Sequence, residues 1–176
     1  ETGWSGEIGF RQGFKVRCWN GFCDISGFWT QYHNMIEFTF GHYYPDSIAG
    51  NPTIADYLNY MGFKACNISN AQINGFEITV AGEGNIFGLP SSLLCGYTYT
   101  NPIDLDLNRD SLKSSKGHIL KYRFYHSVKF DFEITYKKLI IGAGMAYNSF
   151  MINIDKAFED TLRWPNGAPI MQASGK

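Results

Sequence analysis

The stretch from His126 to Ser149 alternates between apolar and polar side chains, and this alternation constrains the fold more than any other feature of the chain. A period of two places successive side chains on opposite faces of a β strand. Lys137 and Lys138 interrupt the pattern, which then resumes, so the stretch predicts two strands joined by a tight turn. The apolar parity holds Val128, Phe130, Phe132, Ile134 and Tyr136, and the polar parity holds Lys129, Asp131, Glu133 and Thr135.

Similar patterns elsewhere predict an all-β protein with about six long strands in three hairpins. The four further strands are expected over residues 3–16, 22–38, 71–84 and 91–100. Asn-Gly between alternating runs is a strong hairpin signal. Tight turns are therefore expected at Asn20-Gly21 and Phe87-Gly88 as well as at Lys137-Lys138. Long connections are expected over residues 41–62, 102–118 and from Asp155 onward. Tight turns make neighbours pair, so the strands should form one antiparallel up-and-down meander.

Strand length and the position of the long loops indicate whether the apolar face points toward a protein core or toward lipid. Strands that approach about fifteen residues are long for a soluble sheet, where about 5–6 is typical. Short turns at one end and long loops at the other are typical of an outer-membrane barrel, whose strands are apolar toward lipid. We therefore expect the following residues to face lipid: Phe130, Phe132, Ile134, Leu139, Ile141 and Met145. Lumen-facing positions are Arg11, Glu77, Lys129, Asp131 and Glu133.

A soluble all-β binding module, such as a lectin-like sandwich, would also show alternation. It accounts less well for the strand length and the asymmetric loops. The formal net charge of −1 argues against a nucleic-acid partner. The four histidines have no metal-ligand spacing, and no catalytic motif is present. The sequence predicts no enzyme, no metal site and no cofactor.

Cys18 and Cys23 flank the sequence Trp-Asn-Gly-Phe. A turn at Asn20-Gly21 would place the two cysteines opposite each other, with Cα atoms about 4.5 Å apart. That separation suits a disulfide. Two separate small apolar residues on the lipid side are an equally good interpretation, and both remain open.

Four stretches, taken in order, resemble the TonB-dependent outer-membrane receptors. They are "GEIGFRQGFKV" with "GFCDISGFWTQYHNMIEF", then "NAQINGFEITVAGEG", "SLLCGYTYTNPIDLDL" and "LKYRFYHSVKFDFEITYKKLIIGAGMAYNSFMINID". The resemblance implies a segment of a barrel of about 22 strands. Residues 1–154 would be a partial barrel without its plug domain, and residues 155–176 an external loop or tail. A small complete outer-membrane barrel is the alternative.

The resemblance also implies a function. Such a receptor takes up a scarce nutrient: a ferric siderophore, haem, cobalamin, a glycan or a peptide. Its partners would be outer-membrane lipid, the remainder of the barrel and the nutrient. A periplasmic energy-transducing protein would act through a plug that this chain lacks. Ligand capture is assigned to loop residues Tyr43, Tyr44, Tyr57, Tyr60, Arg163 and Trp164. An interfacial belt or packing among the loops would also explain these aromatic side chains.

Overall fold

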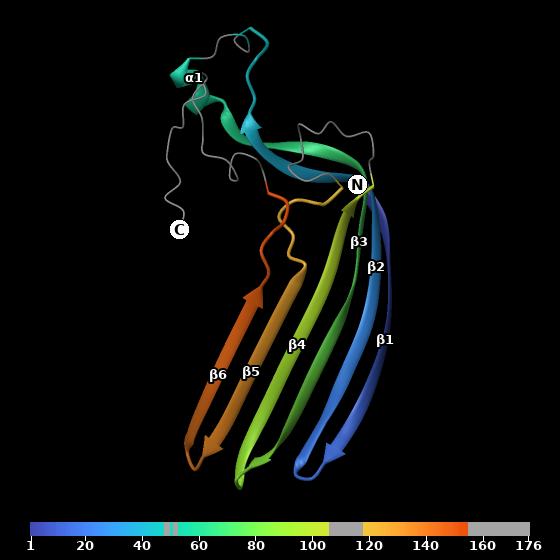
Figure 1. Ribbon diagram of the computed structural model, residues 1–176, viewed down its shortest axis with the longest axis vertical. Coiled ribbons are helices and arrows are strands. Elements are labelled where there is room, and N and C mark those ends of the chain that lie inside the picture. Colours follow the sequence, from blue (N-terminus) through green and yellow to red (C-terminus); the bar gives the residue numbers. More distant parts are fainter. Residues whose placement is uncertain (48–49, 51–52, 106–117, 155–176) are drawn as a thin grey trace.

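The computed structural model describes residues 1–47, 50, 53–105 and 118–154. The strands are β1 Thr2–Val16, β2 Trp19–His42, β3 Met61–Ile86, β4 Leu89–Asp104, β5 His126–Tyr136 and β6 Leu139–Asn148, with a helix α1 over Ile54–Asn59. They form one six-stranded sheet in which each strand pairs antiparallel with the next, β1 to β6 (Figure 1). The meander is therefore confirmed. No second sheet packs against it in the described part of the chain, which is evidence against the sandwich.

The three tight turns lie at one end of the sheet (Figure 1). Phe87-Gly88 and Lys137-Lys138 are turns, as expected. The turn expected at Asn20-Gly21 is wrong, because Arg17 and Cys18 form the turn and Asn20 pairs with Lys15. This register places Arg11 opposite Asp24, and a turn three residues later would separate that oppositely charged pair.

Strands β2 and β3 continue well beyond their neighbours as an outer hairpin, made of residues 35–42 paired with 61–68. Asn34 has a φ of 54° where this hairpin begins. Asparagine adopts such left-handed geometry more readily than most residues. Beyond Asn34 the hairpin bends across the end of the sheet opposite the turns (Figure 1). The connection expected over 41–62 is therefore shorter than the sequence suggested.

Helix α1 lies within that connection and was not anticipated. Thr53 caps its N-terminus, because its hydroxyl accepts a hydrogen bond from the N–H of Asp56 (3.3 Å). The Asp56 carboxylate in turn accepts from the N–H of Thr53 (2.8 Å). The reciprocal pair is a capping box, and the spacing Thr-x-x-Asp was the signal in the sequence that could have revealed it.

A small packed core lies at the end of the sheet away from the turns. Met35, Ala71 and Leu120 are buried there, with Tyr32 and Ile73 packed against them. We call these five residues the outer core. Leu120 belongs to the segment that returns to β5, so the core joins β2 and β3 to a distant part of the chain.

Hydrogen bonds to buried polar groups reinforce the outer core. The N–H of Lys121 donates to Oε1 of the buried Glu37 (2.8 Å). The N–H of Tyr122 donates to the carbonyl of Asn153 (3.0 Å), and the N–H of Asp104 donates to the carbonyl of His118 (3.0 Å). Segments that follow β4 and β6 are thus fixed to the base of the outer hairpin.

Candidate functional site

The register of the ladders divides the side chains of the sheet into two faces. Residues directly opposite each other in antiparallel strands lie on the same face. Phe130 lies opposite Cys95 and Met145, and Phe132 lies opposite Leu93 and Ala143. We call this side the apolar face; it includes Phe10, Ile25, Ile78, Tyr97, Phe130, Phe132, Ile134, Leu139, Ile141 and Met145. All six residues expected to face lipid are on it, and its contact with lipid stays a prediction.

The opposite side is the polar face. It carries all five residues expected to face the lumen, namely Arg11, Glu77, Lys129, Asp131 and Glu133. Nε of Arg11 donates to Oδ2 of Asp24 (2.8 Å), and the Arg11 guanidinium lies 4.7 Å from the ring centroid of Phe22. The hydroxyl of Thr98 donates to Glu77 (3.4 Å). Whether this face lines a lumen stays a prediction.

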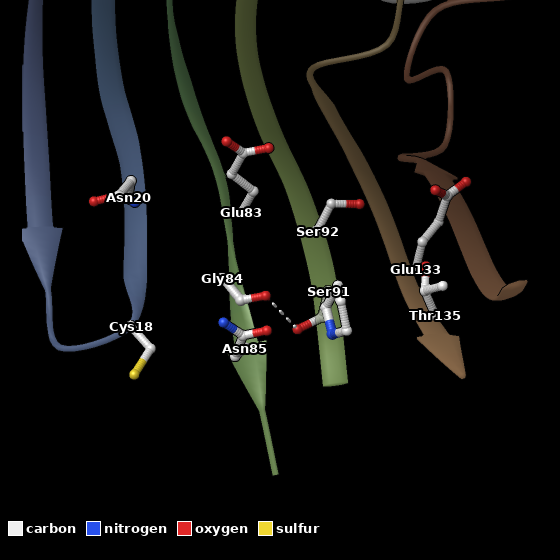
Figure 2. Close-up of a pocket in the computed structure, with 10 residues that line it drawn as sticks. Cys18, Asn20, Glu83, Gly84, Asn85, Ser91, Ser92, Glu133 and Thr135 are labelled. Atoms are coloured by element: carbon white, nitrogen blue, oxygen red, sulfur yellow. Dashed lines mark hydrogen bonds between the residues drawn. The ribbon is translucent and has the colours of Figure 1, made fainter. Parts of the chain in front are cut away.

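A hollow of about 380 Å³ opens near the tight turns. Figure 2 shows its polar lining, which includes the carboxylates of Glu83 and Glu133 and the side chains of Asn20, Ser92 and Thr135. All five belong to the polar face. The hollow therefore offers hydrogen-bond acceptors and negative charge to whatever lies against it. Sequence reasoning missed its composition, because it placed Asn20 in a turn.

The cysteines do not form the disulfide that the sequence left open. Cys18 lies in the first turn, whereas Cys23 lies within β2 opposite Gln12. Both are free thiols, as are Cys66 and Cys95. The shifted turn separates Cys18 from Cys23, so the disulfide interpretation is wrong. Within the described residues, no three His, Cys, Asp or Glu side chains gather closely enough to hold a metal ion. The described residues also contain no helix that is long and apolar enough to span a membrane.

The candidate ligand-binding tyrosines lie near the tip of the outer hairpin. The rings of Tyr44 and Tyr60 are edge to face, with centroids 6.1 Å apart, and the N–H of Tyr43 donates to the carbonyl of Tyr60 (2.9 Å). Nζ of Lys64 lies 5.3 Å from the Tyr43 ring centroid. Tyr57 belongs to α1, but its side chain is not described, and Arg163 and Trp164 lie outside the described residues. Ligand capture by these residues stays a prediction.

Asp56, in the first turn of α1, is the clearest electrostatic feature of this tip. Hydrogen bonds from the side chain and then the backbone of Thr53 lower the pKa of Asp56 from its ordinary value. The same hydrogen bonds stabilise the charged carboxylate at the start of α1, where the helix dipole also favours an anion. Its role is therefore in folding the tip.

A family model described as "TonB dependent receptor-like, beta-barrel" matches residues 1–167. No curated protein matches the chain, and no solved structure matches it. The family match covers every strand described above.

Proposed function

The chain belongs to the TonB-dependent receptor β-barrel family, and we propose that it forms part of the wall of a receptor for one scarce nutrient. Members of this family are transporters of the bacterial outer membrane and are not enzymes. The nutrient classes to be considered are ferric siderophores, haem, cobalamin, glycans and peptides. A small complete barrel would need at least eight strands, two more than the six that the described residues form.

The observation that carries the proposal is the position of the outer core. Its residues Tyr32, Ala71 and Ile73 belong to the polar face, as the register shows. Leu120 therefore packs on the polar side of the sheet. A barrel lumen is polar and its lipid surface is apolar. We infer that the polar face lines the lumen, that the apolar face contacts lipid, and that the outer core stands at the external mouth.

Nutrient capture is assigned to the tip of the outer hairpin. Tyr43, Tyr44 and Tyr60 supply flat amphipathic rings that can contact a ligand with little loss of conformational entropy. Their mutual packing leaves Tyr60 37% exposed, so part of this surface is open to a ligand. In the whole receptor, Arg163 and Trp164 would contribute from the connection after β6.

The turn end of the polar face is assigned to contact with the plug. Glu83 and Glu133 border the hollow there and are both exposed. A plug that presents hydrogen-bond donors or cations would complement these carboxylates. Through that plug, a periplasmic energy-transducing protein would act on the receptor.

The test is nutrient binding by the full receptor, purified from outer membranes in detergent. Isothermal titration would compare ferric siderophores, haem, cobalamin, oligosaccharides and peptides. One class should bind, and Tyr44→Ala with Tyr60→Ala should weaken it about tenfold or more, as expected when an aromatic contact worth about 1.4 kcal/mol is lost. Tyr147→Ala is the matched control, because Tyr147 is exposed on β6, outside the outer hairpin.

Two outcomes would contradict the proposal. A receptor that stays soluble without detergent and never reaches the outer membrane would exclude the transporter role. A receptor that binds its nutrient equally well with and without the two tyrosines would exclude the assigned capture site.

A further inference from the structure

The side chains of β2 change their facing at Asn34, where the outer hairpin begins. The pairing of β2 with β3 is continuous from Trp19 to His42 except at Asn34, which has a φ of 54°. In an unbroken strand every second residue shares a face, so Met35 and Glu37 would continue the apolar face of the sheet. Both are instead buried on the polar side, where Met35 joins the outer core and Glu37 accepts the hydrogen bond from the N–H of Lys121. The left-handed residue therefore redirects the side chains that follow it.

Two rows of side chains alternate along the outer hairpin. The inward row is Met35, Glu37 and Thr39 with their cross-strand neighbours Lys64 and Cys66. The outward row is Ile36, Phe38 and Phe40 with their cross-strand neighbours Phe63, Ala65 and Asn67. The side chains of Ile36, Phe38 and Phe63 are 51%, 59% and 59% exposed, and the ring of Phe63 lies edge to face with that of Phe40 at a centroid distance of 5.0 Å. The observed facing therefore exposes a run of large apolar side chains and buries a carboxylate.

This facing is the reverse of the one that the alternation in the hairpin favours. Large apolar side chains are normally buried, and charged ones are rarely buried. With an ordinary extended φ at Asn34, strict alternation would turn the outward row toward the polar side of the sheet and Glu37 toward water. The register would stay the same, because His33 pairs with Asn70 and Met35 pairs with Ile68, so neither strand carries an extra residue at the bend. The two facings therefore differ by backbone rotation near Asn34 and not by a slip of one strand past the other.

Residues 118–122, which we call the strap, hold the observed facing and are themselves strained. His118 and Tyr122, the two ends of the strap, have φ values of 55° and 56°. Such values are uncommon for residues other than glycine, above all for a bulky side chain such as tyrosine. Nδ2 of Asn153 donates to the carbonyl of Ile119, which fixes the strap from the segment that follows β6. Backbone strain that is held by surrounding contacts is found in segments that switch between conformations.

We propose that the outer hairpin is a two-position switch hinged at Asn34. In the first position the hairpin bends across the end of the sheet, and the strap holds the inward row (Figure 1). In the second position Asn34 is extended, the outward row packs against the strap, and the tip moves away from the end of the sheet. The purpose of the switch rests on the proposed function: the tyrosines of the tip would meet a nutrient in the second position and bring it over the mouth in the first.

The test is thiol labelling of the full receptor in intact cells with a membrane-impermeant maleimide. Cys66 is half-buried in the inward row, and its neighbour Ala65 is exposed in the outward row. Two reporters are made after Cys18, Cys23 and Cys95 have been replaced by alanine. One reporter keeps Cys66 as its single thiol, and the other combines Cys66→Ala with Ala65→Cys. A switch of facing must make one of these adjacent thiols more accessible while the other becomes less accessible.

Asn34→Val should shift the hairpin to the second position, because a β-branched side chain disfavours a left-handed φ. Labelling of Cys66 should become about tenfold faster, and labelling of the Ala65→Cys reporter about tenfold slower. Asn34→Gly accommodates the left-handed φ and should keep the wild-type rates. Asn74→Val is the matched control, because it makes the same substitution at a paired position inside the sheet, and it should change neither rate.

A second pair of variants acts on the strap and not on the hinge. Should Asn34→Val fail to assemble, Glu37→Ala provides the measurement, because it removes the acceptor for the N–H of Lys121 and so weakens the first position. Glu37→Ala should change the two labelling rates in the same opposite directions as Asn34→Val. Glu37→Gln keeps a side-chain oxygen as acceptor and should restore the wild-type rates.

Three outcomes would contradict one proposal or the other. Faster labelling of both reporters would show that the hairpin only frays, and would overturn the switch. Unchanged rates in both Asn34→Val and Glu37→Ala would also overturn it, whatever nutrient the receptor takes, since the labelling needs no nutrient. If neither thiol reacted in intact cells while both reacted in detergent, the hairpin would not lie outside the cell. That result would overturn the proposed function, and the opposite changes of the two rates in detergent would still decide the switch.

Discussion

The long sheet and the outer core differ in what surrounds and stabilises their side chains. In the sheet, Phe132 and Glu133 face opposite surroundings, and strand pairing satisfies the backbone on both sides. Around these two residues the described chain covers neither face, so in the proposed barrel lipid and the lumen would supply the second layer. In the outer core, Leu120 is 1% exposed and the protein itself supplies the surroundings. The effect of a substitution in the sheet therefore depends on the medium that the side chain faces. The effect of a substitution in the outer core depends on the protein side chains packed around it.

The largest expected effect comes from reversing the polarity of the apolar face. Phe132→Arg should block assembly into the outer membrane, because an arginine at the bilayer midplane of a barrel costs about 2–4 kcal/mol. The matched variant Glu133→Arg puts the same side chain on the polar face and should be tolerated. Heat-modifiable electrophoretic mobility of membrane fractions would measure assembly. If the Phe132→Arg variant assembled and the Glu133→Arg variant did not, the two faces would be assigned the wrong way round.

A smaller and local effect is expected in the outer core. Glu37→Ala should leave the buried N–H of Lys121 without its acceptor, at a cost of about 1–3 kcal/mol. Hydrogen exchange should become faster in residues 35–42 and 118–122 while the ladder between β5 and β6 keeps its protection. Glu83→Ala is the control, because Glu83 is exposed on the polar face. Faster exchange throughout the sheet would show that the outer core and the sheet are one cooperative unit.

The ion pair between Arg11 and Asp24 should contribute less to the free energy of unfolding. The Arg11 side chain is 66% exposed and that of Asp24 is 26% exposed, so water screens their attraction. A double-mutant cycle of Arg11→Ala and Asp24→Asn should give a coupling of about 0.2–1 kcal/mol in urea unfolding. Coupling above about 2 kcal/mol would indicate that the polar face is drier than a water-filled lumen.

The smallest effect is expected at the tip of the outer hairpin, where the pKa of Asp56 is lowered. A lowered pKa in the folded state adds stability above the ordinary pKa of aspartate. That stability is lost as the pH falls through the lowered value. Hydrogen exchange of α1, corrected for intrinsic rates, should therefore increase on acidification, and Asp56→Asn should remove this pH dependence. A pH response that persists in Asp56→Asn would assign it to another group.

Much of the fold could be predicted because its determinants are local. The alternation around Phe130 and the long connections were sufficient for the meander and for the two faces. The first turn was misplaced, since Asn20-Gly21 has the better turn chemistry, whereas the cross-strand pairs of β1 and β2, Arg11 with Asp24 among them, together give a register with the turn at Arg17-Cys18. Helix α1 had a readable signal in Thr53 and Asp56 that was overlooked.

The sequence by itself determined which side chains share a face, because a strand turns by a half rotation at each residue whatever it packs against. Only the tertiary structure decided which side chains from different strands lie next to one another on those faces. Glu37 and Lys121 meet across 84 residues of sequence, and Gly27, Phe76 and Tyr99, from three different strands, line one hollow of the sheet. Such meetings depend on the register of several strands at once, and a register is the sum of many weak cross-strand preferences that no single stretch contains.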